Sequence, residues 1–198
     1  MKGIYTMEII DVKCRKIQEE DLRMIMEWRM MPEITQYLSS NPKLTMESQY
    51  KWFENIKNDE KRGMTEERKN YYWVLEVDGI PSGIVSLVNA DYKARKIETG
   101  AYVAVKEKRS IRLAVDIQWN LYEYAFSVLK MHKVCEEVFE ENRAVNRILD
   151  MCGSKREGIL RDHVYKDGEF YNVVVRGMLK DEWDSTRMNL NYNHFEFE

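Results

Sequence analysis

The sequence predicts one α+β domain, with a mixed, mostly antiparallel sheet of about seven strands flanked by about four helices. Three observations support this fold class. Apolar, β-rich runs alternate with segments of helical periodicity along nearly the whole chain. Two-residue turn signals join neighbouring runs, as they do in antiparallel hairpins. The 198 residues are 44% hydrophobic, which is enough for one substantial core.

The N-terminal third predicts a strand and two helices. Residues 8–16 alternate as a half-buried strand does. Acidic residues 19–21 complement the dipole at the start of a helix that ends near Pro32. Thr45 is a candidate N-cap for the second helix. Residues 58–70 are charged and poor in apolar groups, so we expect a flexible loop there.

The middle of the chain predicts three strands and a long helix. Residues 71–77 and 83–89 are apolar runs, and residues 78–81 between them carry a turn signal. Residues 97–105 form a further strand. Residues 113–129 place apolar side chains at helical spacing, which indicates an amphipathic helix.

The stretch from 129 to 183 is the most informative, because it predicts a strand, a helix and a hairpin without a break. Residues 133–139 are apolar and β-rich, Asn142 stands at a helix N-cap position, and Gly153 closes the helix. An Asp-Gly turn then joins the last two predicted strands, residues 158–166 and 169–179.

Composition excludes several classes of function. The formal net charge is only -3 with both signs mixed, so nucleic acid is not an expected partner. The chain has no long apolar run and no secretion signal, which predicts no membrane association. The histidines match no metal spacing, so no metal is expected. Three widely spaced cysteines indicate free thiols in a reducing cytoplasm: Cys14, Cys135 and Cys152.

Residues 1–185 are predicted to form the domain, and residues 186–198 a C-terminal tail. Phe195 and Phe197 make that tail partly apolar, so the sequence is compatible with a monomer or a homodimer.

The C-terminal half resembles the GNAT N-acetyltransferase superfamily. The words "HKVCEEVFEENRAVNRILDMCGSKREG" carry the resemblance, and Asn142 and Gly153 match the family pattern N-x-x-A-x-x-L-x-x-x-x-G, with Val145 at the small-residue position. The branch is the one that holds ribosomal-protein, polyamine and nucleotide-amino-sugar acetyltransferases. The resemblance implies the GNAT fold, and acetyl-CoA as co-substrate.

The same resemblance implies where acetyl-CoA binds. The backbone at Val103, Ala104 and Val105 would pair with the pantetheine arm, and an N–H group at or near Val103 would stabilise the oxyanion. Asn142 would contact the arm, and Arg147 would add charge near the phosphates. A loop opening a helix would grip the pyrophosphate with its amides; it comprises Arg109, Ser110, Ile111, Arg112, Leu113 and Ala114.

Two positions depart from the family pattern. Arg112 stands where the key loop glycine is expected, so it could either reach over the phosphates or block them. Leu149 replaces a tyrosine that many members use as the general acid. A thiol with a pKa of about 8.5 can leave without that acid.

Glu98 and Tyr102 are the candidate catalytic residues. A substrate ammonium has a pKa of roughly 10 and must lose a proton before attack. Glu98 stands two residues before Gly100, where the branch often carries an acid, and it could equally be a surface carboxylate. Tyr102 shares its face of the strand by period two.

Two helices are expected to form the acceptor side. The resemblance places there Trp28, Arg29, Trp52 and Phe53. Core packing is the competing interpretation for the aromatic residues. An inward Arg29 needs an anionic partner, which could be a substrate phosphate, a carboxylate or Glu33.

The predicted function is transfer of an acetyl group to a primary amine of a small molecule, with an amino sugar preferred over a polyamine. No cysteine is expected in the cleft, which favours direct attack in a ternary complex. Two alternatives remain: acetylation of a protein N-terminus, as in the ribosomal-protein type, and a non-catalytic GNAT module with a degenerate loop.

Overall fold

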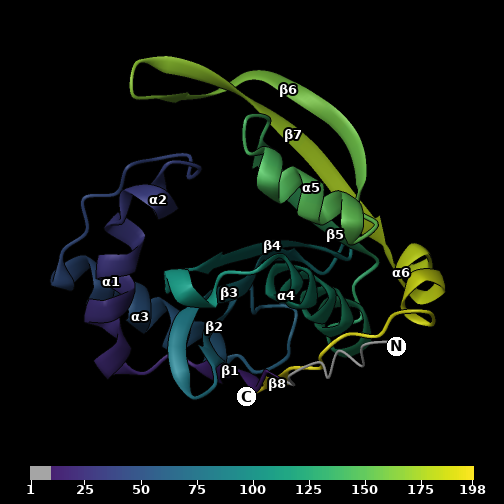
Figure 1. Cartoon of the computed structure of the whole chain (residues 1–198). Helices are drawn as coiled ribbons and strands as arrows, with labels where there is room; N and C mark the ends of the chain where they lie inside the picture. The colour runs from purple at the N-terminus through teal and green to yellow at the C-terminus, as the bar shows by residue number, and fades with distance from the viewer. Residues whose placement is uncertain (1–9) are drawn as a thin grey trace, which may run out of the picture.

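The computed structural model describes residues 10–198, which form one eight-stranded sheet with helices on both faces (Figure 1). The strands are β1 (Val12–Lys16), β2 (Tyr71–Val77), β3 (Ile80–Asp91), β4 (Lys96–Val103), β5 (Lys133–Phe139), β6 (Lys155–Lys166), β7 (Glu169–Leu179) and β8 (Glu196–Phe197). The helices are α1 (Leu22–Met30), α2 (Pro32–Thr35), α3 (Met46–Lys61), α4 (Ile111–Glu123), α5 (Arg143–Met151) and α6 (Lys180–Arg187). The strand order is β6-β7-β5-β4-β3-β2-β1-β8.

This arrangement confirms the predicted α+β class and the mixed sheet. The differences in number come from short elements, since α2, α6 and β8 carry too few residues for a clear periodic signal. The predicted N-caps are also present, because Thr45 accepts from the Ser48 amide and Asn142 accepts from the Val145 amide.

Two predicted boundaries were wrong. α3 extends through Lys61, so the start of the predicted loop 58–70 is helical, where Asp59 pairs with Arg62 one turn later. β3 begins at Ile80, because the turn needs only Asp78 and Gly79, both at positive φ.

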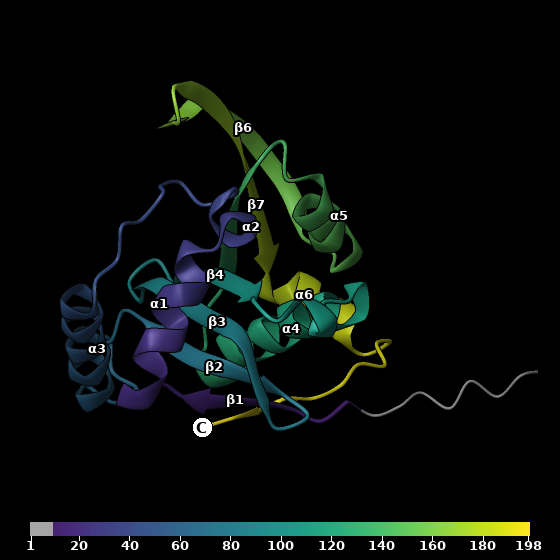
Figure 2. The same ribbon diagram turned by 60° about the vertical axis from the view of Figure 1, so that its left-hand side comes forward.

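The sheet separates two hydrophobic clusters. Figure 2 shows the helices that cover them, with α1 and α3 on one side of the sheet and α4 on the other. The larger cluster packs beneath α4 and includes Trp73, Leu121 and Trp183. The smaller cluster lies under α1 and α3 and includes Trp28 and Phe53. Alternate residues of β2, β3 and β4 therefore serve different cores, as the period of a strand requires.

The ladder between β4 and β5 is short. These two parallel strands pair only over three positions, from Lys96 opposite Lys133 to Glu98 opposite Cys135. Beyond that point β4 continues against β3 alone, and β5 continues against β7 alone. The two strands therefore diverge in the middle of the sheet.

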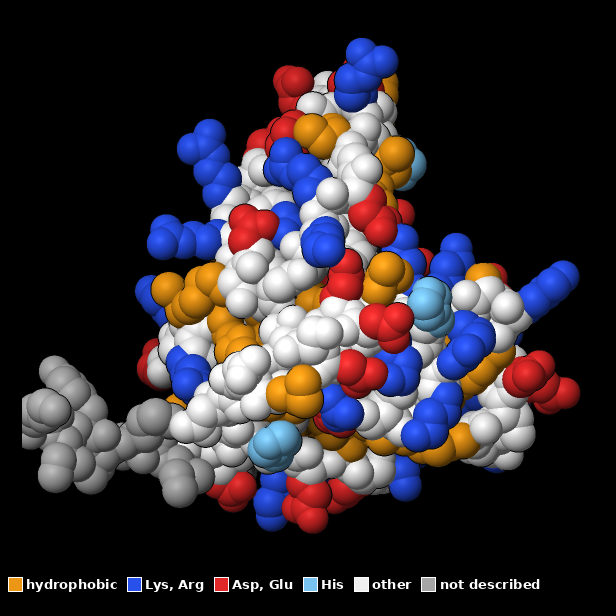
Figure 3. Space-filling view, turned by 90° about the vertical axis from the view of Figure 1, so that its right-hand side faces the viewer, with side chains coloured by type: hydrophobic (Ala, Val, Ile, Leu, Met, Phe, Trp, Pro, Cys, Tyr) orange, Lys and Arg blue, Asp and Glu red, His pale blue; other side chains and the backbone are white. Residues whose placement is uncertain are grey.

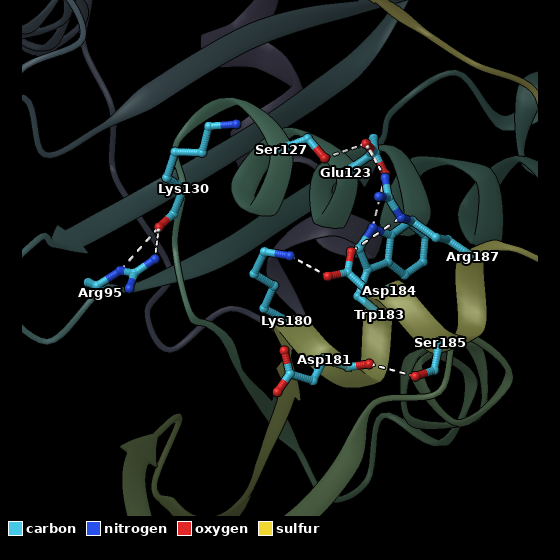
Figure 4. Close-up of polar contacts among 10 residues, drawn as sticks. All are labelled: Arg95, Glu123, Ser127, Lys130, Lys180, Asp181, Trp183, Asp184, Ser185 and Arg187. Atoms are coloured by element: carbon cyan, nitrogen blue, oxygen red, sulfur yellow. Dashed lines mark hydrogen bonds and ion pairs between the residues drawn. The ribbon is translucent and has the colours of Figure 1, made fainter.

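The C-terminal segment packs against the domain. Glu123 of α4 accepts hydrogen bonds from Ser127, from the Trp183 indole and from Arg187, which fixes α6 (Figure 4). Further on, β8 pairs in parallel with β1. Phe195 and Phe197, whose apolar character suggested a homodimer, pack on the chain's own larger core.

On the face drawn in Figure 3, Lys and Arg side chains are interspersed with Asp and Glu side chains. Within residues 10–198, no helix combines the length and apolar character that crossing a bilayer requires. The same part of the chain contains no cluster of His, Cys, Asp and Glu arranged to hold a metal ion.

Candidate functional site

The divergence of β4 and β5 creates the candidate site, which we call the split: residues 99–103 of β4 and residues 136–139 of β5. The Ala104 amide donates to Ser82 of β3 at 2.7 Å. Amides alternate in direction along an antiparallel ladder, so those of Thr99, Ala101 and Val103 point toward the split. The β4 backbone therefore offers donors to a ligand that would lie there as an added strand.

Arg109 fixes the end of β4. Its guanidinium donates to the Val103 carbonyl at 2.8 Å and to the Ala104 carbonyl at 2.9 Å. The Val105 amide is also used, since it donates to Ser82. Of the three predicted backbone positions, Val103 is thus the one whose N–H group faces the split.

The predicted loop opens α4 as expected. Ser110 is the N-cap, and its hydroxyl accepts from the Leu113 amide at 3.1 Å, while the Ala114 amide donates to the Ser110 carbonyl. The amides of Ile111 and Arg112 have no hydrogen-bond partner in the described chain. A helix N-terminus with two free amides can bind an anionic group.

Arg112 does not cover this helix start. Its Nε donates to Asp116 one turn along α4 at 2.8 Å, and its terminal nitrogen donates to the Asn191 carbonyl of the tail at 3.0 Å. The side chain is therefore directed along the helix, away from the free amides of the first turn.

Asn142 lies at the start of the second helix on this face. Its side-chain oxygen accepts from Val145, and no residue in the described range accepts a hydrogen bond from its Nδ2 amide. Arg147 is exposed on the same helix and makes no ion pair there. Asn142 is only 8% exposed, and the contacts with a ligand that the resemblance implies for these two residues stay predictions.

Glu98 lies at the vertex of the split, where the ladder ends. Its carboxylate accepts from the Asn89 side chain at 2.9 Å. The structure corrects one expectation here, because Cys135 is half-buried and pairs with Glu98 on the same face. A cysteine therefore does lie beside the predicted catalytic acid. Burial raises the pKa of this thiol, although nearby Lys133 and Lys96 oppose the shift, so the sulfur is held as a thiol.

Tyr102 lies on that same face, near Arg29 of α1. Burial raises the pKa of the Tyr102 hydroxyl, and the positive charge of Arg29 opposes this shift. The Tyr102 hydroxyl and the Arg29 Nε are both buried without a hydrogen-bond partner in the described structure. Two unpaired polar groups near each other suit a site that a polar ligand completes.

The other predicted acceptor residues divide into two groups. Trp52 is partly exposed and packs edge-on against Tyr72 at 5.5 Å. Trp28 and Phe53 are core residues, as the competing interpretation held. Glu33 does not pair with Arg29; it lies 3.9 Å from Arg109 instead, because α2 turns toward the cofactor loop.

A strap that was not predicted connects the two sides of the split, and it comprises α2 and residues 36–41. At one end Glu33 approaches Arg109. At the other end Lys166, only 7% exposed, donates to the carbonyls of Thr35, Gln36 and Leu38 at 2.6 to 3.2 Å. Figures 1 and 2 show the β6–β7 hairpin reaching over to this segment.

A second contact reinforces the strap. Asn41 donates to both carboxylate oxygens of Asp167 at 2.6 and 2.8 Å. With the β4–β5 ladder, the strap completes a ring of chain around the open end of the split. No local sequence signal marks this contact, because its partners lie more than 120 residues apart.

A buried polar network behind the vertex was also missed. Glu136 of β5, 3% exposed, accepts from Tyr122 at 2.6 Å, from Ser154 at 2.9 Å and from Gln118 at 3.2 Å. Burial raises the pKa of the Glu136 carboxyl, and the bonds from Tyr122 and Ser154 oppose that shift. The available sequence signal was the two-residue spacing of Val134 and Glu136, which places this glutamate on the inward face of the strand.

A short parallel ladder that diverges between two helix N-termini is the arrangement expected of an acyl-CoA-binding enzyme. The family model described as "Acetyltransferase (GNAT) domain" matches residues 12–155. The chain therefore belongs to the GNAT acetyltransferase family, which confirms the class of enzyme that the sequence predicted.

Known proteins add detail to this assignment. A putative ribosomal N-acetyltransferase, YdaF of Bacillus subtilis, is 30% identical over 57% of this chain and 61% of its own length. Spermidine N(1)-acetyltransferase of Escherichia coli K12 is 24% identical over 82% of this chain and 83% of its own. A spermidine N-acetyltransferase structure from Vibrio cholerae, in complex with CoA and spermine, has a TM-score of 0.78 at 20% identity, covering 87% of this chain and 98% of that one.

Proposed function

We propose that this protein is an acetyl-CoA-dependent N-acetyltransferase that acts on a primary amine of a small molecule, with a polyamine as the first candidate acceptor. The observation that carries the proposal is the split itself. The free β4 amides face the split, the free amides of α4 follow the end of β4, and Asn142 follows the end of β5.

The residues present fit acetyl-CoA. The amides of Ile111 and Arg112 can bind the pyrophosphate, and the Arg112 side chain leaves them open. The exposed Arg147 adds positive charge near the start of α5. The β4 amides, that of Val103 among them, can pair with the pantetheine arm and donate to the acyl oxygen. Acetyl-CoA supplies the thioester that an amine attacks.

Glu98 is the proposed base for the incoming ammonium. It lies at the vertex, and its carboxylate is held by Asn89 on the face that also carries Tyr102. Cys135 is nearby, but its raised pKa keeps it protonated and therefore a poor nucleophile. Direct transfer from thioester to amine remains the proposed route.

The polyamine now ranks ahead of the amino sugar. Spermidine acetyltransferases occur among both the sequence relatives and the structural neighbours. The ring formed by the strap also favours a slim acceptor, because Lys166 and Asn41 hold the strap to the hairpin. An acceptor with a narrow, extended amine can enter beside this strap, whereas a folded protein surface would meet it.

The alternative is an N-terminal acetyltransferase of the ribosomal-protein type, which the name of the YdaF relative favours. An unfolded N-terminus is also slim, so the strap does not exclude it. The free thiols of Cys14, Cys135 and Cys152 are consistent with a reducing compartment such as the cytoplasm.

The test has two stages. Isothermal titration with acetyl-CoA comes first, and micromolar binding is expected. Initial rates are then measured with spermidine, an amino-sugar nucleotide and an unstructured N-terminal peptide at equal concentration. Turnover highest with spermidine supports the proposal, and a preference for the peptide supports the alternative. Absence of acetyl-CoA binding by a cooperatively folded protein would instead indicate a non-catalytic module.

A further inference from the structure

Gln118 of α4 connects the two strands directly beyond their last pair. Its Nε2 donates to the Thr99 hydroxyl of β4 at 3.3 Å and to the Glu136 carboxylate of β5 at 3.2 Å. Thr99 and Glu136 follow Glu98 and Cys135, the pair at which the ladder ends. The Gln118 side-chain amide therefore connects the two strands where their next backbone pair would lie.

Both strands continue beyond the last pair of the ladder. β4 continues for five residues past Glu98, and β5 continues for four residues past Cys135. The pairing of β3 with β4 is irregular between Val88 and Asp91, beside the end of the ladder. At the same point the Gln118 side chain joins β4 to β5, so it contributes to fixing their separation.

The partners of Gln118 are themselves held firmly. The Oε2 atom of Glu136 accepts from Ser154. Its Oε1 atom accepts from Tyr122 as well as from Gln118. Gln118 is only 7% exposed and lies on the buried face of α4. A largely buried hydrogen-bond network restricts the relative position of the elements that it joins.

We propose that Gln118 is a positioning residue that sets the opening of the split, and with it the fit of acetyl-CoA against the β4 amides. This inference rests on the proposed function, because the ligand of the split is taken to be acetyl-CoA. Gln118 itself would contact neither the amine nor the thioester.

The test compares Gln118→Leu with Thr99→Val by isothermal titration with acetyl-CoA. Gln118→Leu removes both hydrogen bonds at similar volume, and Thr99→Val removes one of them without changing shape. We expect the dissociation constant to rise about tenfold and about threefold, respectively. The double variant should match Gln118→Leu alone, because both changes break the same connection.

Glu123→Gln is the matched control. Glu123 also belongs to α4, but its partners Ser127, Trp183 and Arg187 all lie outside the split. This variant should lower the melting temperature and leave acetyl-CoA affinity unchanged. A Gln118→Leu protein with a lower melting temperature and unchanged acetyl-CoA affinity, as in the control, would overturn the proposal. If Gln118→Leu does not fold, Thr99→Val decides the question alone.

Hydrogen exchange of the free protein gives a readout that does not depend on acetyl-CoA. The Gly100 and Tyr102 amides, which face β3 in the ladder, should exchange faster in Gln118→Leu and in Thr99→Val than in the wild type, and at the wild-type rate in Glu123→Gln. Unchanged exchange in all three variants would overturn the proposal. A wild-type protein that does not bind acetyl-CoA would contradict the proposed function, and exchange would still decide the role of Gln118.

Discussion

Glu98 of β4 and Cys135 of β5 form the last pair of the parallel ladder, with their side chains on one face of the sheet. The proposed base thus has a thiol beside it at the vertex of the split. The other two cysteines, Cys14 and Cys152, are fully buried.

Cys135 should therefore report on occupancy of the split. We expect Cys135 to be the thiol of the native chain that iodoacetamide modifies first, slowly at neutral pH and at a rate that keeps rising above pH 8.5, because burial raises its pKa. Acetyl-CoA should slow this reaction. Labelling followed by peptide mass analysis checks the site, and Cys135→Ser should abolish this first modification. Equal labelling with and without acetyl-CoA would place the ligand elsewhere.

Glu98→Gln should lower turnover by about a hundredfold, because general-base catalysis contributes effects of that order. The rise of rate with pH should also flatten, while the dissociation constant for acetyl-CoA stays the same. Steady-state rates from pH 6 to 9.5 measure this. Glu66→Gln, at an exposed carboxylate in the loop after α3, is the control and should retain the wild-type profile. An unaltered profile in Glu98→Gln would leave Glu98 with a structural role.

Asn142→Asp separates capping from ligand contact. The carboxylate keeps the acceptor for the Val145 amide, so the N-cap and the melting temperature should be retained. The Nδ2 donor is lost, and a negative charge faces an anionic ligand, so acetyl-CoA should bind at least about tenfold more weakly.

Asn142→Ala should lower both the melting temperature and the affinity for acetyl-CoA. It removes the N-cap, whose loss costs about 1 kcal/mol, together with the Nδ2 donor. Isothermal titration and thermal melting of the two variants give the comparison. Full affinity in Asn142→Asp would show that this side chain serves only the helix.

Lys166→Met should release the strap. Three carbonyls lose a charged donor, which costs on the order of 2 kcal/mol of stability. Limited proteolysis should cut within residues 36–43 sooner, and the KM for the amine should rise while acetyl-CoA affinity is retained.

Lys155→Met is the control for this change, because that lysine lies on the same strand but is exposed. It should behave as wild type in both assays. An unchanged KM for the amine in Lys166→Met would show that the strap does not contribute to the acceptor side.

Glu123 gives a prediction about stability and pH. Burial tends to raise the pKa of its carboxyl, but bonds from Ser127, Trp183 and Arg187 outweigh this, so the folded-state pKa is lowered. Its stabilising contribution is therefore present above the unfolded pKa of about 4.3, and is lost as pH falls through the lower folded-state pKa. Glu123→Gln should be less stable than wild type at pH 7 by on the order of 1 kcal/mol.

Denaturant titrations at pH 7 and near pH 3 test the sign. The difference between Glu123→Gln and wild type should shrink at the lower pH. A difference that grows on acidification would contradict the lowered pKa.

Much of this fold was predictable because its signals are local. Residues 133–139 form the predicted strand without any shift, and Thr45 and Asn142 cap the helices that they were expected to cap. Such features depend on side chains within about four residues of each other, so the sequence displays them directly. The family motif around Asn142 added the GNAT fold and the class of enzyme.

Local signals predicted the longer helices and strands, two of the N-caps and the family. The directions of Arg112 along α4 and of Cys135 beside Glu98, and the contact of Lys166 with the strap, follow from the packing of distant segments. The same is true of the connection from Gln118 to both strands of the split. Each of these depends on groups that are distant in the chain and meet only after the sheet has assembled, because strand register and helix docking fix which side chains come within hydrogen-bonding distance.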